Sequence, residues 1–489
     1  MMSTLSQRIL FGLKVRQLRQ ELGLSFAELS ARSGVSVSFL NEMEKGKKGA
    51  RPEKLAALAK ALQVTPEWLT SDDPGTHLAP VAALLKSNFL NELPLDMFGI
   101  DAGRVLELLS AAPLQINAFV STLVELAQNH ALGEGHFYLT AMRAYQELNN
   151  NYFPEIEEAA RTCRATFGVD AHGPLSLPEI KRILINGFGV KIDPSGLDKY
   201  DELRELRSVF VPKKRKLLLN GRLSPEQTAF VLAKEIGFHV LGLKDRPLSS
   251  SLYQVTSFQE VLNNFKAGYF AVALMIEEHS FLQRLEQTFA QPTFDHRLMH
   301  HWMQEYGVGP DVLLQRFNVI TAHWGLDHVF FHRLVYRRSD GVYRMDKELH
   351  LHPEGRRYAG RLDEQYCRRW LSSQLIRQVE ESQGRTPVTG MMKATFHRTG
   401  DTYLCLGLAK PSTFREDECI GLMIGVQLDE QLHEHFTFLD SQSIPEMEIN
   451  LTCERCSLMD CQERASAPVW LEQREKRQNV RDRIDRITG

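Results

Sequence analysis

Apolar residues recur at helical spacing in five short segments near the start of the chain. Residues 6–22 carry the first such pattern, and residues 24–46 carry two further short helices. Residues 52–62 predict a fourth helix, and Pro66 begins a fifth. The inward positions of the first helix are Ile9, Leu13, Leu18 and Leu22. This spacing predicts a compact all-α bundle over residues 1–70.

A tight turn divides the second segment into two helices. Ser25 is placed to cap the first of them, with Glu28 three residues later as its capping-box partner. Gly34 stands at the turn, where a residue free to adopt positive φ is needed, and Ser36 is placed to cap the next helix. Two short helices joined in this way predict a helix-turn-helix. Its second helix is short enough to lie in a DNA major groove.

The middle of the chain changes its periodicity. A polar linker over residues 71–80 precedes long helical periodicity over residues 81–165, which predicts a helical connector suited to dimerisation. Residues 180–193 and 207–220 are typical of strands. A helix capped at Ser224 follows, with proline at its first position.

The last part of the chain predicts a sensor-like domain of helices followed by a mainly antiparallel sheet. Strand-like runs begin at about residue 328, and a charged helix closes the chain. The sequence therefore predicts an α+β multidomain protein. Its expected parts are the all-α head, the linker, the connector, an α/β domain, an α+β sensor domain and the final helix, at residues 1–70, 71–80, 81–165, 166–290, 291–470 and 471–489.

The composition is typical of a soluble globular protein. The 489 residues are 43% hydrophobic and 24% charged, and no apolar run approaches the roughly 18 residues of a membrane span. The first residues lack the apolar core of a signal peptide, so the expected location is the cytoplasm, with no membrane partner. Seven cysteines in a reducing compartment argue against a disulfide framework. Where they cluster, they indicate metal or redox chemistry.

Charge is distributed unevenly along the chain. The formal net charge is −3, which alone would argue against nucleic acid as a partner. Residues 1–70, however, carry eleven Lys or Arg and six acidic residues. The predicted helix-turn-helix is therefore the basic part of the protein, as phosphate contacts require.

Residues 8–70 resemble the lambda-repressor-like (XRE) family, on the stretch RQLRQELGLSFAELSARSGVSVSFLNEMEKGKK. The resemblance implies binding to double-stranded operator DNA. The family usually places Gln at the start of the second helix, where it meets a phosphate, and Phe26 stands there in this chain. By resemblance, Ser36, Val37, Ser38 and Asn41 would face bases, and Arg16, Arg19, Lys45 and Lys47 would face the DNA backbone. The alternative is that the serines only cap a helix and the cations form a solvated face.

The helix after Ser224, with the following FQEVLNNFKAGYFAVALMI, resembles the ImmA/IrrE metallopeptidase-like domain. Active members carry H-E-x-x-H, two zinc ligands one turn apart with Glu as general base. The five positions here are Lys234-Glu235-Ile236-Gly237-Phe238, and the usual acidic third ligand falls at Lys266. We therefore expect no catalytic residues and no enzyme. The domain is expected instead to line a cavity, where a phosphate-bearing ligand would meet Lys234 or Lys266.

A cysteine cluster is the strongest chemical signal after the helix-turn-helix. Cys453, Cys456 and Cys461 can grip one metal centre from a single loop, and such centres usually want a fourth ligand. Cys367, Cys405 and Cys419 are candidates, and Cys367 is favoured because the other two lie in apolar strand-like runs. A [4Fe–4S] cluster, a structural Zn²⁺ site and unligated thiols all remain open.

The cysteine segment, with the upstream Cys367–Trp370 and the stretch AYQELNNNYFPEIEEAARTCR, resembles regulators that join an XRE head to a degenerate IrrE-like domain. These are the short-chain fatty-acyl-responsive regulators of propionate, acetate and glyoxylate metabolism. The family often has Gly at the position of Thr452. The resemblance implies a transcription factor that binds a short-chain acyl-CoA and carries a [4Fe–4S] cluster on the four cysteines.

The prediction from the whole sequence is a sequence-specific, DNA-binding transcriptional regulator that responds to a small effector. A homodimer would place two recognition helices about 34 Å apart on a palindromic operator. The alternatives are a metallopeptidase-type regulator and an antitoxin-like regulator, each acting on a protein partner.

Overall fold

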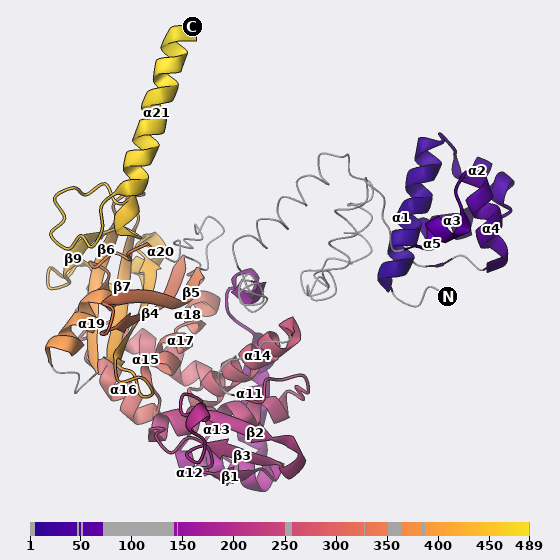
Figure 1. Ribbon diagram of the computed structural model, residues 1–489. Helices are drawn as coiled ribbons and strands as arrows, with labels where there is room; N and C mark the ends of the chain where they lie inside the picture. Colours follow the sequence, from indigo (N-terminus) through magenta and orange to yellow (C-terminus); the bar gives the residue numbers. More distant parts are fainter. Residues whose placement is uncertain are drawn as a thin grey trace. The chain divides into compact units, whose positions relative to one another are not determined.

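The computed structural model forms two compact units, Met1–Ala141 with Val255–Gln259, and Met142–Gln254 with Glu260–Gly489. Most of the predicted linker and connector lies outside the residues that the structure describes. Those residues are 5–45, 48–49, 52–71, 141–143, 145–249, 257–326, 328–350, 364–382 and 387–488 (Figure 1).

The first unit contains the five predicted helices of the head. They are α1 (Leu5–Glu21), α2 (Phe26–Ser33), α3 (Val37–Glu44), α4 (Pro52–Ala61) and α5 (Pro66–Thr70) (Figure 1). Their apolar faces meet in one core built around Phe11, Val15, Leu29, Leu40, Met43 and Leu58. The amphipathic spacing predicted the helices, but it placed the buried side of α1 wrongly. The buried side chains of α1 include Phe11, Lys14 and Val15, whereas Leu18 and Leu22 are only partly buried, and the side chains at positions 9 and 13 lie outside the described ones.

The turn between α2 and α3 has the predicted geometry. Ser25 Oγ accepts a hydrogen bond from the backbone N–H of Glu28, whose carboxylate accepts one from the N–H of Ser25. Gly34 adopts a positive φ of 66°, and its N–H donates to the carbonyl of Ser30. Ser36 Oγ accepts from the N–H of Phe39 and so begins α3. Local side-chain chemistry thus fixes the helix-turn-helix.

The second unit begins with helices around a small sheet. These elements are α11 (Pro154–Thr166), α12 (Leu177–Arg182), η2 (Ile183–Gly187), β1 (Lys191–Asp193), η3 (Asp201–Leu203), β2 (Ser208–Val211), η4 (Pro212–Lys214), β3 (Lys216–Leu219), α13 (Pro225–Val240) and α14 (Phe258–Met275). The strand order is β1-β3-β2, with β1 parallel and β2 antiparallel to β3. A Cβ at Gly237 would lie 2.9 Å from the ring of Phe270, so glycine permits the close approach of α13 to α14.

The strand predicted over residues 180–193 is wrong for most of its length. A capping box between Ser176 and Glu179 starts a helix, and Pro178 stands in its first turn. Ile180 and Ile183 are then buried at helical spacing against the core. An apolar run of this length fits both periodicities, and the local cap decides for the helix.

Four helices lead into a six-stranded sheet. The helices are α15 (Glu278–Phe289), α16 (Leu298–Tyr306), α17 (Pro310–Arg316) and α18 (Val319–His323). The strands are β4 (Val329–Arg337), β5 (Val342–His350), β6 (Val388–Phe396), β7 (Thr402–Pro411), β8 (Glu418–Gln427) and β9 (Glu446–Ile449), in the order β5-β4-β8-β7-β6-β9. Neighbouring strands are antiparallel except for the parallel pair β6 and β9, which confirms the predicted mainly antiparallel sheet.

The sheet is covered on both faces. Alternate residues of β7 point to the core shared with α13–α18 or to a second core beneath α19 (Leu371–Glu381). Cβ atoms at Gly407 and Gly421 would lie 3.0 Å or less from atoms of α19, so glycines let this helix lie directly on the strands. The remaining elements are α20 (Glu430–His435), η5 (Thr437–Asp440), η6 (Cys453–Arg455) and α21 (Val469–Thr488).

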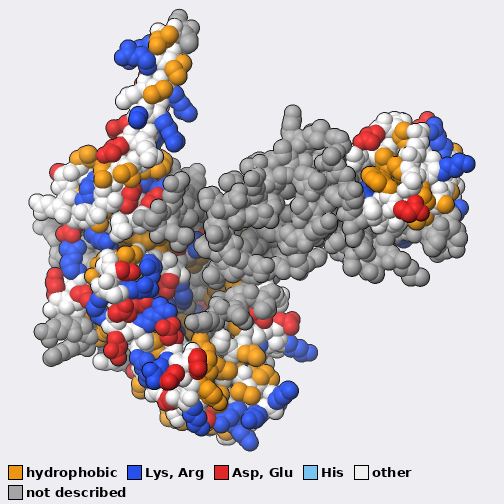
Figure 2. Space-filling view, viewed as in Figure 1, with side chains coloured by type: hydrophobic (Ala, Val, Ile, Leu, Met, Phe, Trp, Pro, Cys, Tyr) orange, Lys and Arg blue, Asp and Glu red, His pale blue; other side chains and the backbone are white. Residues whose placement is uncertain are grey.

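Helix α21 extends away from the sheet and shows both apolar and basic side chains on its exposed surface (Figures 1 and 2). Within the described ranges, no helix combines the length and the apolar character needed to cross a membrane.

Candidate functional sites

The residues predicted to face DNA bases gather at the start of α3. Ser36, Val37 and Ser38 are exposed, Val37 by 45%, and Asn41 is half-buried one turn further along. An exposed valine at the tip of a short helix is suited to apolar contact with a base edge. The structure thus brings the four predicted base contacts to one end of one helix.

The predicted backbone contacts separate into different environments. Lys45 is exposed at the end of α3, Arg16 is half-buried on α1, and Lys47 lies outside the described residues. Arg19 is tied down within the head, because its Nε and Nη2 donate to the carboxylate of Glu44 at 2.6 and 3.0 Å. A phosphate contact by Arg19 stays a prediction, and it would compete with this ion pair.

Phe26 explains part of this arrangement. The guanidinium of Arg19 lies 4.1 Å from the centroid of the Phe26 ring, and Nη1 donates to the carbonyl of Leu24. Phe26 thus contacts an arginine of α1 at the position where the family usually places Gln. Lys14 also has a structural place, since its fully buried ammonium donates to the carbonyls of Trp68 and Ser71. Not every cation of the head is therefore presented to solvent.

The positions that correspond to the metallopeptidase motif contribute to a polar cluster at α13. Arg246 donates to both carboxylate oxygens of Glu235, at 2.9 and 2.6 Å, and His239 Nε2 lies 3.2 Å from the same group. Burial raises the pKa of Glu235, but the hydrogen bonds from His239 and Arg246 outweigh it and leave the pKa below its ordinary value. Glu235 is therefore a paired anion, unsuited to act as a general base.

Lys234 occupies the other end of this cluster. Its Nζ donates to Asn264 Oδ1 of α14 at 2.6 Å. Burial, and then the nearby positive charges of Arg207, Lys347 and Arg246, lower the pKa of Lys234 to about 7. A pocket beside this cluster is lined by residues that include Lys234 and Asn264. Lys266, the second cation that the sequence suggested, does not line it. Two residues along α14 correspond to about 200° of helix rotation, so Asn264 and Lys266 point to different sides.

The pocket beside this cluster is small and partly open. It is lined by residues of β2, β3, α13, α14 and the segment after α13. The charges of Lys347, Arg333 and Lys410 act on the same group of ionisable residues as the pocket cations. We call the pocket together with these neighbouring cations the basic cleft, defined by Arg207, Lys234, Arg246, Arg333, Lys347 and Lys410.

Acidic groups balance only part of this charge. Asp311 of α17 lies 3.8 Å from Arg333, and Asp346 of β5 lies 3.5 Å from it. Burial acts to raise the pKa of Asp311, but Arg333, Lys347 and the neighbouring cations hold it well below its usual range. With Glu235, Glu418 near Arg333 and Glu226 near Lys410, five acids face the six cations, so most of the positive charge is balanced.

The four predicted cysteines line one cavity. Cys367, Cys453 and Cys456 are buried and Cys461 is half-buried. Cys405 and Cys419, the rejected candidates, lie buried in β7 and β8, as expected of core residues. The choice of Cys367 as the fourth residue therefore agrees with where the structure places its thiol.

Backbone pairing brings Cys367 to the C-terminal loop. Tyr366 and Thr452 form an antiparallel bridge, flanked by hydrogen bonds from the N–H of Cys367 to the carbonyl of Leu451 and from the N–H of Cys453 to the carbonyl of Gln365. Burial, with smaller contributions from Cys453 and Cys456, raises the pKa of Cys367 to about 11. This thiol is therefore neutral at physiological pH unless a metal replaces its proton.

Arg464 holds the loop in shape. Its guanidinium donates to the carbonyls of Cys453, Cys456 and Leu458 at 2.9, 3.0 and 2.6 Å, and more weakly to Ser466 at 3.3 Å. The N–H of Ala465 also donates to Cys453 Sγ. Arg464 was not predicted as part of the site, although it follows Cys461 by only three residues in the sequence.

The cavity fits a metal centre in the chemistry of its donor set. Four thiols from two chain segments converge, and no carboxylate or imidazole competes among them except Glu463 at the rim. Across the part of the chain that the structure describes, no three His, Cys, Asp or Glu side chains are arranged to hold a single metal ion.

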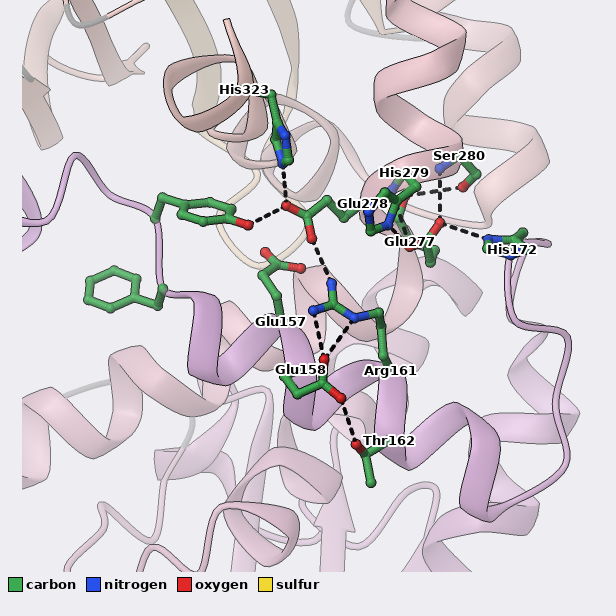
Figure 3. Close-up of polar contacts among 12 residues, drawn as sticks. Glu157, Glu158, Arg161, Thr162, His172, Glu277, Glu278, His279, Ser280 and His323 are labelled. Carbon is green, nitrogen blue, oxygen red and sulfur yellow. Dashed lines mark hydrogen bonds and ion pairs between the residues drawn. The ribbon is translucent and has the colours of Figure 1, made fainter. Parts of the chain in front are cut away.

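A second polar network, which the sequence did not indicate, surrounds Glu277 and Glu278 at the start of α15 (Figure 3). Glu277 accepts from His172 Nδ1 and His279 Nδ1 at 3.2 and 3.0 Å. Glu278 accepts from Arg161 and His323, and also from the hydroxyl of Tyr152. These contacts join α11, α15 and α18, so the network ties the NNNYFPEI segment to the body of the unit.

Comparison with known proteins supports the two predicted modules. Residues 15–69 match the helix-turn-helix family model, and residues 187–318 match the model of the IrrE N-terminal-like domain. The chain therefore carries both domains, and the second match runs beyond the boundary expected at residue 290.

The similar proteins carry the names of regulators. The HTH-type transcriptional regulator RamB of two Mycobacterium tuberculosis strains is 26% identical over 295 residues, which cover 55% of this chain and 58% of RamB. The Propionyl-CoA carboxylase regulator of Cereibacter sphaeroides is 23% identical over 299 residues, 58% of this chain and 60% of that protein. The chain thus spans less than two thirds of the length of these relatives. A solved Mycobacterium tuberculosis transcriptional regulator aligns with a TM-score of 0.47 and 17% identity, over 66% of this chain and 92% of that one.

Proposed function

We propose that this protein is a DNA-binding transcriptional regulator of carbon metabolism that acts as a homodimer. The exposed first turn of α3, on a helix-turn-helix whose caps and core are complete, carries the proposal. The relatives named as regulators support it. Two copies would place their α3 helices in successive major grooves, about 34 Å apart, on a palindromic operator.

Selection of binding sites from a randomised DNA duplex, followed by fluorescence anisotropy, tests this function. We expect an enriched palindrome, and an affinity that falls steeply with salt because Lys and Arg displace counterions from phosphates. Val37→Glu should abolish selective binding, while Val480→Glu on α21 serves as an exposed, matched control. The function is rejected if the folded protein enriches no sequence over the starting library.

The effector is proposed to be a short-chain acyl-CoA held in the basic cleft. A coenzyme A thioester presents several phosphate charges, which Lys and Arg recognise, and Lys234, Arg207 and Lys347 converge where such charges would lie. The printed name of the Cereibacter relative, a regulator of propionyl-CoA carboxylase, favours this ligand class.

Calorimetric titration with acetyl-, propionyl- and butyryl-CoA tests the effector. Lys234→Ala should weaken binding by roughly tenfold or more, since it removes one close charge contact. Lys266→Ala is the matched control, because Lys266 shares α14 with Asn264 but does not line the pocket. Equal losses in the two variants, or no binding of any thioester, would reject this effector site.

The metal centre is proposed to be a [4Fe–4S] cluster held by Cys367, Cys453, Cys456 and Cys461. When bound, it would supply a one-electron redox centre and so a second input to the regulator. The residues around it keep the loop in place: Arg464 fixes the carbonyls, and the Tyr366–Thr452 bridge holds the two segments together. Anaerobic purification with iron, sulfide and zinc analysis tests this assignment, and zinc without sulfide would replace it by a structural zinc site.

The protein is proposed not to be an enzyme. Phe238 cannot bind a metal, Lys234 donates to Asn264, and Glu235 is neutralised by Arg246. These three positions leave the metallopeptidase alternative without its metal ligands and general base. Zinc-dependent cleavage of a protein partner by the Cys453→Ser variant would contradict this proposal.

A further inference from the structure

Arg368 lines the cysteine cavity and carries a buried hydrogen-bond donor without a partner. It follows Cys367, and its guanidinium carbon lies 3.8 Å from the centroid of the Tyr343 ring. Nη2 donates to Gln365 Oε1 at 2.9 Å, but Nη1 is shielded from solvent and has no hydrogen-bond partner. A buried donor without an acceptor destabilises the fold, and more strongly so when the donor is charged. An acceptor inside the cavity would remove that destabilisation.

The other two arginines that line the cavity already donate to backbone carbonyls. Arg464 uses its guanidinium on four backbone carbonyls of the loop, so it serves the protein frame. Arg369 donates to the carbonyl of Glu448, on β9. Among the described arginines of this cavity, Arg368 therefore holds the unpaired donor.

Sulfur is the side-chain acceptor that remains in this cavity, because Arg377 already donates to both carboxylate oxygens of Glu463. The cavity lining contains four cysteines, and Cys453 Sγ already accepts one N–H, from Ala465 at 3.3 Å. A guanidinium beside a thiolate-ligated iron–sulfur centre compensates negative charge. Hydrogen bonds to the sulfurs and nearby charge are among the factors that set the reduction potential of such clusters.

We propose that Arg368 is a positioning residue of the cysteine centre, which donates Nη1–H to a cysteine or cluster sulfur and raises the reduction potential. Reduction adds one electron, and thus one negative charge, to the centre. A fixed positive charge beside it favours the reduced form. This inference rests on the proposed [4Fe–4S] cluster.

The full chain, purified without oxygen, provides the test. Wild type, Arg368→Gln, Arg368→Lys and the remote control Arg481→Gln on exposed α21 are compared by iron and sulfide content, circular-dichroism melting and dye-mediated redox titration read by electron paramagnetic resonance. We expect Arg368→Gln to have a more negative midpoint potential than wild type. Arg368→Lys, which keeps the charge, should lie between the two, and Arg481→Gln should equal wild type.

The outcomes separate the role of Arg368 from the assignment of the cluster. Clusters of equal potential in wild type and Arg368→Gln overturn the role of Arg368 and leave the cluster assignment standing. Loss of the cluster from both folded Arg368 variants also overturns it, because a frame residue would behave in that way. Retention only in Arg368→Lys supports it. A wild-type protein with neither iron nor sulfide overturns the proposed cluster itself.

Discussion

Arg316 and Glu157 form a two-point ion pair in the centre of the second unit. Nη1 and Nη2 of Arg316 donate to the two carboxylate oxygens of Glu157 at 2.6 and 3.0 Å, and the two side chains are 0% and 2% exposed. The hydroxyl of Tyr269 donates to the same carboxylate at 2.8 Å. The pair, with Tyr269, therefore joins α11, α14 and α17.

Removing one partner of this pair should destabilise the unit strongly. Arg316→Ala leaves the Glu157 carboxylate buried without its cation, so we expect a loss of about 3–5 kcal/mol and a clearly lower melting temperature. Scanning calorimetry measures it. The double variant Arg316→Met with Glu157→Leu should be more stable than Arg316→Ala alone, because no unpaired charge remains. A single variant as stable as wild type would contradict the importance of the pair.

The Glu277 network should make stability depend on pH in the acidic range. Burial acts to raise the pKa of Glu277, but hydrogen bonds from Ser280, His279 and His172 lower it to about 2 (Figure 3). A carboxyl with a lowered folded-state pKa stabilises the fold fully above its unfolded value near 4.5, and this contribution is lost as pH falls from there towards 2.

Urea unfolding at about pH 7 and about pH 4 measures this contribution. Glu277→Gln should lose about 1–3 kcal/mol at neutral pH and show a flatter pH dependence than wild type. Glu158→Gln is the control, since Glu158 is 67% exposed on the same surface. Parallel pH profiles for wild type and Glu277→Gln would show that the network does not hold this carboxylate.

Effector binding should weaken as pH rises through neutrality. The pKa of Lys234 is about 7 in the unliganded protein, so its ammonium is mostly charged at pH 6 and mostly neutral at pH 8. Only the charged form attracts a phosphate, and binding must take up a proton at the higher pH. Titration calorimetry with a short-chain acyl-CoA at both values should show a several-fold loss of affinity. Lys234→Arg stays charged and should show a smaller loss.

Local signals in the sequence predicted most of the fold, while the sites depended on contacts between distant residues. Some helix starts are fixed within four residues, by Ser25 with Glu28 in one case and by Ser224 with its proline in another. The sequence therefore reveals these helix starts. Cys367 could be chosen only by excluding Cys405 and Cys419, because the bridge that brings it to Cys453 spans more than 80 residues.

The errors have different causes. Ile183 fits a strand or a helix equally well by its apolar pattern, and the capping box of Ser176 and Glu179 decides for the helix. Lys266 suited an anion site by charge, but the rotation of α14 presents Asn264 to Lys234 instead. Arg333, Lys347 and Lys410 were not considered, because they reach the basic cleft from strands far along the chain.

Arg16 and Arg19 of α1 should respond differently to substitution. Arg19→Ala removes the ion pair with Glu44, which is 5% exposed, and leaves that carboxylate without its partner, so the head should melt several degrees lower. Arg16→Ala should weaken DNA binding, with a salt dependence reduced by about one phosphate contact. Melting curves and anisotropy titrations on the same samples separate stability from affinity. If Arg19→Ala melts like wild type yet binds DNA less tightly, its main role is the phosphate contact that the family resemblance implied.

The cysteine loop should lose its shape when Arg464 is replaced. Four carbonyls of the loop accept hydrogen bonds from this one guanidinium, and a lysine has neither the planar fork nor the number of donors to replace it. We expect Arg464→Lys to keep the fold of the sheet, as judged by circular dichroism, but to lose most bound iron and to expose Cys456 to alkylation. Arg377→Lys is a suitable control, because Arg377 forms only a half-exposed pair with Glu463 beside the same cavity. Thiol labelling of the anaerobic protein, followed by mass spectrometry, measures how accessible Cys456 is in each of the two variants. Equal iron content and equal labelling in both would mean that backbone pairing alone keeps the loop closed.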